Sequence, residues 1–230
     1  MPGSSVAIET RKAYERWAPV YPPTAHNPLM RVEQQAMLDQ WPPVAGRRAL
    51  DLACGTGRYA ALLSGDKASY VVALDSCLPM LSQVSPARRV CADMMRLPFV
   101  DGAFDVVICG LALGHATSAQ DWMTEIARVL SPGGTLLYSD FHPEAARAGL
   151  TRSFKDQNDR TCTVPHCCHE PAAQWDAAAA AGLAIETVRE VRVGFELREA
   201  FPKSEEFYRR WHGLPIVLVV RAGKESACTG

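Results

Sequence analysis

Three aspartates and a pair of glycines carry the clearest chemical signal in the sequence. Asp51 lies at the end of a short apolar run, and Gly55-Thr56-Gly57 begins four residues later. Asp75 and Asp93 each follow a further apolar run. Because parallel strands bring their carboxyl ends to one edge of a sheet, we expect these residues to line one ligand site. Carboxylates at this edge can bind an ammonium group, ribose hydroxyls and an exocyclic amine.

The glycine pattern alone is compatible with two cofactors. Gly55-x-Gly57-x-x-Ala60 also satisfies the dinucleotide fingerprint of dehydrogenases. A pyrophosphate on this turn would be repelled by Asp51, whereas the α-ammonium group of S-adenosylmethionine would gain a charge-assisted partner. Asp75 can serve the ribose of either cofactor. The sequence therefore favours S-adenosylmethionine, with S-adenosylhomocysteine as product. A nicotinamide-dependent oxidoreductase and a non-catalytic adenosylmethionine-binding module are the alternatives.

The elements that would position these residues follow from hydrophobic patterning. Apolar runs alternate with helix-forming segments from Ala49 to Asp140, which is typical of a parallel sheet with crossover helices. Ser131-Pro132-Gly133-Gly134 should end the last of these helices. We expect strands over residues 49–53, 70–74, 89–92, 104–109, 135–139, 183–193 and 214–221. We expect helices over residues 59–63, 79–83, 120–130 and 171–181, and a short one after Ser204.

Five motifs occur in a fixed order along residues 47–140. They are Asp51-Leu-Ala-Cys-Gly-Thr-Gly57, Leu74-Asp-Ser-x-x-x-Met-Leu81, Ala92-Asp-x-x-x-Leu-Pro-Phe99, Phe104-Asp-Val-Val107 and Glu125-Ile-Ala-Arg-Val-Leu-Ser-Pro-Gly-Gly134. In this order they resemble the class I S-adenosylmethionine-dependent methyltransferases, in particular the small-molecule branch with the ubiquinone/menaquinone and malonyl-carrier methyltransferases. The resemblance implies a doubly wound, Rossmann-like α/β fold. Its seven-stranded sheet is mostly parallel, with the last strand antiparallel.

The resemblance also implies contacts with the cofactor. It places Asp51, Gly55 and Gly57 at the methionine moiety, Asp75 at the ribose, and Asp93 with Met94 at the adenine. The complete set of expected cofactor residues is Tyr14, Tyr21, Asp51, Ala53, Gly55, Gly57, Asp75, Ser76, Met80, Asp93, Met94, Gly110 and Leu111. The structural alternative is that Asp51 and Asp75 cap the helices that follow them, and that Met80 belongs to the core.

The segments outside this core should build an acceptor chamber within a single domain. We expect residues 1–46 to form a helical lid, residues 47–140 the cofactor-binding core, and residues 141–170 and 194–212 insertions around the substrate. The expected substrate contacts are Trp17, Phe141, His166, His169 and Trp211. His115 and His142 are the candidate general bases, since an unperturbed histidine titrates near neutral pH, and the alternative is that they only shape the pocket. We expect in-line methyl transfer to oxygen or nitrogen of a small molecule, and a heteroaromatic metabolite would suit the aromatic residues.

The remaining composition narrows the class of partner. The formal net charge is -1 without a basic stripe, so we do not expect a nucleic-acid partner. The apolar run Ile216–Val220 is too short to span a bilayer, and eight cysteines without a disulfide pattern suit a reducing compartment. We therefore expect a cytoplasmic monomer or homodimer. The cluster Cys162, His166, Cys167, Cys168 and His169 lacks the spacing of zinc sites, so we expect a pocket wall there and no metal, with a thiol role left open.

Overall fold

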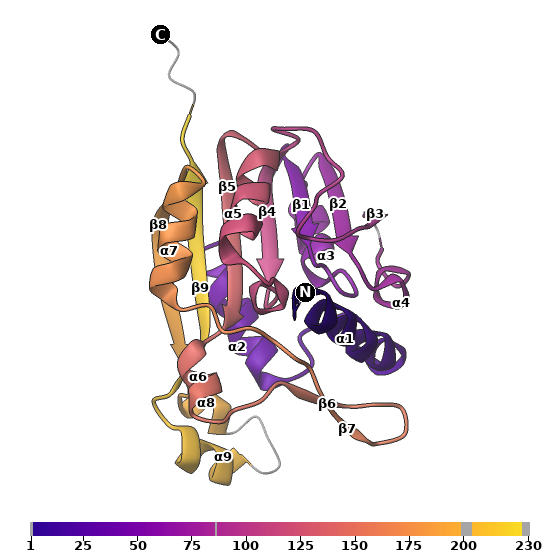
Figure 1. The fold of residues 1–230 in the computed structure, drawn as a ribbon, viewed down its shortest axis with the longest axis vertical. Coiled ribbons are helices and arrows are strands. Elements are labelled where there is room, and N and C mark those ends of the chain that lie inside the picture. Colours follow the sequence, from indigo (N-terminus) through magenta and orange to yellow (C-terminus); the bar gives the residue numbers. More distant parts are fainter. Residues whose placement is uncertain (1, 86, 199–203, 227–230) are drawn as a thin grey trace.

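The central sheet of the protein follows the order β3-β2-β1-β4-β5-β9-β8 (Figure 1). The structure is a computed structural model that describes residues 2–85, 87–198 and 204–226. The strands of this sheet are β1 (Arg48–Leu52), β2 (Tyr70–Asp75), β3 (Arg88–Cys91), β4 (Phe104–Gly110), β5 (Leu130–Phe141), β8 (Leu183–Arg192) and β9 (Pro215–Lys224). Strands β1 to β5 pair in parallel, whereas β9 runs antiparallel to both of its neighbours. The expected seven-stranded, mostly parallel sheet with an antiparallel last strand is confirmed.

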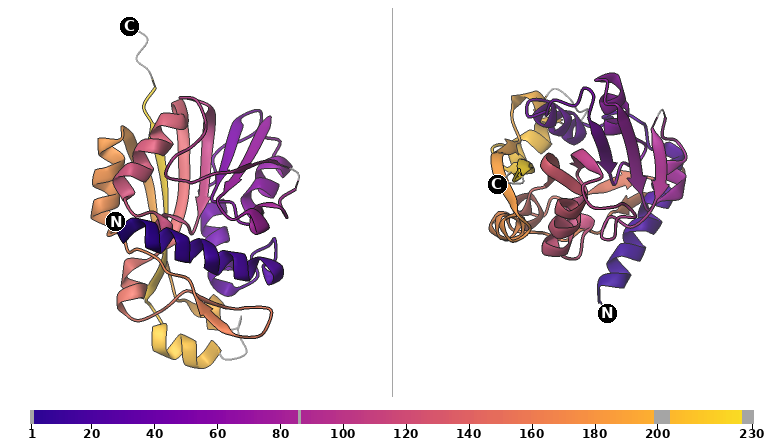
Figure 2. Two further views of the ribbon diagram at one scale, coloured as in Figure 1. Left: turned by 45° about the vertical axis from the view of Figure 1, so that its right-hand side comes forward. Right: turned by 90° about the horizontal axis from the view of Figure 1, so that it is seen from above.

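Helices cover both faces of this sheet (Figures 1 and 2). They are α1 (Pro2–Trp17), η1 (Ala18–Val20), α2 (Pro28–Leu38), α3 (Arg58–Gly65), α4 (Leu78–Leu81), η2 (Leu113–His115), α5 (Ala119–Val129), α6 (Pro143–Arg147), α7 (Pro171–Ala180), α8 (Phe195–Arg198) and α9 (Ser204–Trp211). Helices α5 and α7 pack on one face, and α2 and α3 on the other. Side chains of β4 alternate between these layers. Val107 and Cys109 join the α5 side, and Val106 and Ile108 join the α2 side.

The sequence placed most elements within one or two residues of their observed bounds, and β5 is the main departure. This strand begins at Leu130, so the expected turn Ser131–Gly134 forms an irregular start of the strand. The register against β4 shifts there, between Phe104 and Val106. Gly133 has a φ of +75°, a conformation that glycine adopts without steric cost.

The N-terminal helix lies across the edge of the sheet where the parallel strands end (Figure 2). Beneath it lies the hairpin of β6 (Ser153–Lys155) and β7 (Thr161–Thr163), which the sequence patterns did not predict. The ring of Trp17 stacks on Phe154 of this hairpin at 4.4 Å, so the two segments contact each other directly. None of the helices in the described part of the chain is long and apolar enough to cross a membrane.

Candidate cofactor and acceptor site

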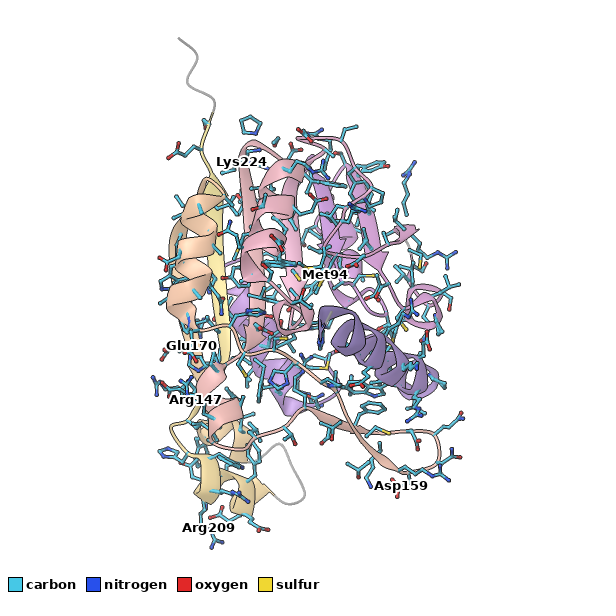
Figure 3. The ribbon with its side chains drawn as sticks, viewed as in Figure 1. Met94, Arg147, Asp159, Glu170, Arg209 and Lys224 are labelled. Atoms are coloured by element: carbon cyan, nitrogen blue, oxygen red, sulfur yellow. The ribbon has the colours of Figure 1, made fainter. Side chains whose placement is uncertain are left out.

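A cavity of about 780 Å³ lies at the carboxyl ends of the parallel strands, beneath α1. This volume falls within the range of roughly 300–1,000 Å³ that is usual for small-molecule sites. Figure 3 shows Met94, one of its lining residues, above α1, and Lys224 at the opposite end of the sheet. The expected cofactor residues on its wall are Tyr14, Tyr21, Asp51, Ala53, Gly55, Asp75, Ser76, Met80, Asp93, Met94, Gly110 and Leu111.

Asp51 is a buried carboxyl group that has, within the described part of the chain, one hydrogen bond and no ion pair to offset the cost of burying its charge. Its side chain is 1% exposed, and one oxygen accepts a 2.7 Å hydrogen bond from the backbone N–H of Ala60 in the first turn of α3. Burial raises the pKa of Asp51 to about 7, against the opposing effects of that hydrogen bond and of the Arg58 charge. Asp51 therefore does cap α3, but only through one of its two oxygens. Its side chain also lines the cavity. An ammonium group placed beside it would restore the favourable ionisation that burial removes.

Asp75 organises the glycine turn from the end of β2. One oxygen accepts the backbone N–H of Gly55 at 2.8 Å, and the other accepts that of Cys77 at 2.8 Å. Burial raises the pKa of Asp75, and these two backbone bonds oppose the shift. The backbone N–H of Ser76 lowers the pKa as well, so at least one of the roughly four acceptor positions on the two oxygens remains for a ligand hydroxyl. The residues at this edge therefore fit an adenosine ligand with an ammonium group.

The backbone around the cavity is held in uncommon conformations. Ala53 and Leu111, which follow β1 and β4, have positive φ values of 54° and 58° although neither is glycine. Strain of this kind persists where the surrounding structure over-determines the backbone, and it clusters at ligand sites. Gly57 lies outside the cavity wall: it begins α3 with a φ of +86°, and a Cβ there would lie 2.8 Å from Val84 Cγ1. Gly57 therefore allows the tight turn into α3 and its close packing against Val84, without lining the cavity itself.

A buried acidic side chain of α2 supports the floor of the site. Glu33 is 0% exposed and forms a 2.8 Å ion pair with Arg58. It also accepts hydrogen bonds from the hydroxyl groups of Tyr59 at 2.8 Å and Ser139 at 2.6 Å. The network ties α2 to α3 and β5, and it satisfies an otherwise costly buried charge.

A Cβ on Gly110 would lie 2.4 Å from the Tyr59 ring, so this position at the end of β4 requires glycine.

Aromatic side chains of α1, and that of Tyr21 after η1, line one side of the cavity. Trp17 stacks on Tyr14 with centroids 5.9 Å apart and meets Tyr21 edge-on at 4.6 Å. These rings pack against a small cluster that contains the buried thioether of Met80. Met80 therefore belongs both to this cluster and to the cavity wall.

His115 lies on the cavity wall within a polar group of three side chains. Its Nε2 is 3.0 Å from the Tyr14 hydroxyl and 3.3 Å from Nη1 of Arg152. Because guanidinium groups only donate, Nε2 is the unprotonated nitrogen, and Tyr14 donates to it as well. Burial and the neighbouring Arg152 charge lower the pKa of His115 well below its usual range. His115 is therefore neutral at physiological pH, and its basic nitrogen already has partners.

The candidate base His142 and several expected substrate residues lie outside the cavity wall. His142 caps α6, where its Nδ1 accepts the backbone N–H of Glu144 at 3.2 Å, and its Nε2 lies 3.6 Å from Glu190. His166 meets the ring of Phe141 edge-on at 5.2 Å, and His169 bonds through Nε2 to the carbonyl of Ala116 at 2.9 Å. These three histidines are engaged in structural contacts.

Trp211 also lies away from the cavity wall, on α9, with the guanidinium of Arg210 4.6 Å above its ring. By contrast, Phe141 and Trp17 line the cavity as expected. The contact of these two with an acceptor remains a prediction.

Two further contacts hold the cysteine- and histidine-containing segment. Cys168 Sγ lies 3.9 Å from Nε2 of His166, and the backbone N–H of Cys167 bonds to the carbonyl of Gly114. Among the residues that the structure describes, no group of three or more His, Cys, Asp or Glu side chains could hold a metal ion. The described cysteines are all free thiols.

Three polar residues of the site carried no signal in the sequence motifs. Arg152 lines the cavity from the segment before β6, and Glu33 supports its floor from α2. Asp140 is 3% exposed at the end of β5, and burial raises its pKa to about 6, against the opposing effect of Arg152. The position of Asp140 beside a strand end was the only hint available.

Comparisons with known proteins agree with this geometry. Residues 50–138 match the family model described as "Methyltransferase domain". The chain is 36% identical over 115 residues to a demethylmenaquinone methyltransferase of Beutenbergia cavernae, covering 48% of each chain. It is 31% identical over 153 residues to a malonyl-[acyl-carrier protein] O-methyltransferase of Methylovorus sp., covering 60% of this chain and 51% of the relative. The chain spans about half the length of the curated relatives it matches.

A solved methyltransferase structure has a similar fold. An S-adenosylmethionine-dependent methyltransferase from Mesorhizobium loti, known from its crystal structure, superposes with a TM-score of 0.68 at 26% identity. The superposition covers 84% of this chain and 97% of that one. Together with the acidic, glycine-containing strand edge, these likenesses favour S-adenosylmethionine over a nicotinamide cofactor. Residues 50–138 thus match a methyltransferase domain, and the chain is similar in sequence and fold to S-adenosylmethionine-dependent methyltransferases.

Proposed function

We propose that the protein transfers the methyl group of S-adenosylmethionine to an oxygen or nitrogen atom of a small-molecule acceptor. The observation that carries this proposal is one continuous cavity with two kinds of wall. Asp51, Asp75 and Asp93 line it, and so do apolar side chains such as Phe141 and Ile216. A volume of about 780 Å³ leaves room for an acceptor beside the cofactor.

Each carboxyl group has a distinct task in this proposal. Asp51 holds the ammonium group of the cofactor, Asp75 its ribose hydroxyls, and Asp93 its adenine amine. The bound cofactor supplies an electrophilic methyl group on a sulfonium. The protein contributes by aligning the acceptor and excluding water, which is a large part of catalysis in a displacement of this kind. Neutral His115 accepts the hydroxyl of Tyr14 and so orients that hydroxyl, which lines the cavity, toward the acceptor.

The segments outside the core provide the enclosure. Residues 1–46 form the lid in this proposal, because Tyr14, Trp17 and Tyr21 cover the strand edge. Residues 141–170 and 194–212 surround the acceptor, although residues 199–203 lie outside the described part of the chain. From its composition, we further propose a cytoplasmic protein, monomeric or homodimeric, whose acceptor is not a nucleic acid.

Calorimetric titration with S-adenosylhomocysteine tests the cofactor site. Asp75→Ala should bind at least about tenfold more weakly, because ionic hydrogen bonds contribute about 1.5–3 kcal/mol each. Asp66→Ala, an exposed position at the end of α3, should bind like the wild type. Incubation of a metabolite extract with methyl-deuterated S-adenosylmethionine should then label a small molecule. If titration with NAD gives heat of binding and titration with S-adenosylhomocysteine gives none, the proposal is rejected.

A further inference from the structure

Arg152 presents a cationic group to the cavity, and all of its hydrogen-bond partners are neutral. Its Nη1 donates to the carbonyl of Leu111 at 3.0 Å and lies 3.3 Å from Nε2 of His115. Its Nη2 donates to the hydroxyl of Tyr14 at 3.3 Å. Tyr14 and His115 are themselves 3.0 Å apart, so together they occupy the end of the guanidinium group between its two Nη atoms.

One edge of this guanidinium group remains available. Arginine has five N–H donors in a fixed fork. The three contacts above use both hydrogens of Nη1 and one of Nη2, and within the described residues the Nε hydrogen and the second Nη2 hydrogen have no partner. These two hydrogens lie on the same edge of the plane. That edge matches the two oxygens of a carboxylate, or the single oxygen of a phenolate.

The positive charge of Arg152 also lacks a close counterion. No carboxylate of the described chain lies within 4.0 Å of it, whereas Arg58 pairs with Glu33 and Arg147 pairs with Glu170. The Arg152 charge lowers the pKa of Asp140, but the two side chains form no ion pair and Asp140 does not line the cavity. The nearest titratable neighbours on the wall, His115 and Tyr14, are neutral because burial disfavours their charged forms. A half-buried cation without a counterion is costly unless a ligand provides the negative charge.

Apolar side chains line the same cavity as Arg152. Phe141 at the end of β5, Leu150, Leu197 of α8 and Ile216 of β9 share the cavity with it. An apolar body with a single acidic group would satisfy both features of this cavity. We propose that the methyl acceptor is an apolar organic acid whose carboxylate or phenolate oxygen is bound by the free edge of Arg152. This inference rests on the proposed methyltransferase function and adds the chemical class of its acceptor.

Paired acids and amides test the inference directly. The protein is saturated with S-adenosylhomocysteine and titrated with benzoate, salicylate and indole-3-acetate, and then with the corresponding amides. At least one acid should bind, and its amide should bind at least tenfold more weakly. Arg152→Met should weaken acid binding at least tenfold, and Arg152→Lys, which keeps the charge but loses the fork, should give an intermediate affinity. Arg147→Met removes a comparable arginine outside the cavity and should bind like the wild type.

The outcomes separate this inference from the proposed function. Failure of S-adenosylhomocysteine to bind the wild type would reject the proposed function itself. Cofactor binding without binding of any of the three acids, or equal affinity for acids and amides, would overturn the role of Arg152. If Arg152→Met does not fold, Arg152→Lys decides the question, since an affinity equal to that of the wild type would also overturn it.

Discussion

Replacing Asp51 with asparagine should make the ligand-free protein more stable and its cofactor binding weaker. The side chain is 1% exposed and its pKa is raised to about 7, so ionisation at neutral pH opposes folding. Asparagine has nearly the same shape, and its oxygen can still accept the hydrogen bond from Ala60. The substitution therefore removes the buried charge while it keeps the helix cap.

The size of the stability effect follows from the two pKa values. The ordinary value is 3.8 and the folded value is about 7. At about 1.4 kcal/mol per unit, the difference corresponds to roughly 4 kcal/mol as an upper limit. Because the folded pKa is raised, the contribution of the neutral carboxyl group is fully present below pH 3.8 and is lost as the pH rises to 7. Asp51→Asn should thus be more stable than the wild type at pH 8 and nearly equal at pH 4.

The binding effect has the opposite sign. An ammonium group favours ionised Asp51, so cofactor binding below pH 7 should release a proton from the wild type and none from Asp51→Asn. Calorimetry with S-adenosylhomocysteine at pH 6.5, in buffers of different ionisation enthalpy, measures this release. The affinity of the variant should fall at least about tenfold, since ionic hydrogen bonds contribute about 1.5–3 kcal/mol.

Asp105→Asn is the matched control for both measurements. Asp105 lies outside the cavity and bonds to Arg48 and Ser131, and the hydrogen bonds from Arg48 lower its pKa. Its removal should lower stability at pH 8 and leave the affinity unchanged, the reverse of Asp51. If Asp51→Asn instead lowers the free energy of unfolding at pH 8 and binds S-adenosylhomocysteine normally, Asp51 only caps α3, and the reasoning is refuted.

Three further predictions test the scaffold around the cavity. Gly57→Ala combines a φ of +86° with a 2.8 Å contact to Val84, so urea denaturation should show a loss of about 1–3 kcal/mol, partly restored by Val84→Ala. Glu33→Gln leaves a buried arginine unpaired and should cost about 3–5 kcal/mol in the same assay, whereas an unchanged midpoint would contradict the buried network. Trp17→Ala should speed release of S-adenosylhomocysteine in stopped-flow measurements, and Phe154→Ala should do likewise if their stacking holds the lid.

The sheet could be predicted because its pattern is local. Each strand of the core reads as a short apolar run, and each crossover helix begins after a turn with glycine, proline or a small polar residue. The hairpin of β6 and β7 could not be predicted in this way. Strands β6 and β7 have three residues each, and the stacking of Phe154 on Trp17 joins positions 137 residues apart. Such a contact leaves no periodicity in the sequence.

The cavity wall was predicted at the strand ends and missed where side-chain direction decides. Phe141 is the last residue of β5 and His142 follows it, and we expected the first to contact substrate and the second to act as a base. Adjacent residues of an extended backbone point to opposite sides, so only one of them can face the cavity. Phe141 does, and His142 instead caps α6. Glu33 and Arg152 lie in segments without a motif, and their importance follows only from what the fold places beside them.

Two charges with little compensation lie on the wall of the same cavity and have opposite signs. Asp51 accepts one backbone hydrogen bond, and Arg152 meets only neutral groups. A core selected for stability alone would pair or remove both, because isolated buried charges oppose folding. Their retention on one wall is explained if ligands supply the missing partners, a cation beside Asp51 and an anion beside Arg152. The stability that the free protein gives up at these two positions is then recovered when the ligands bind.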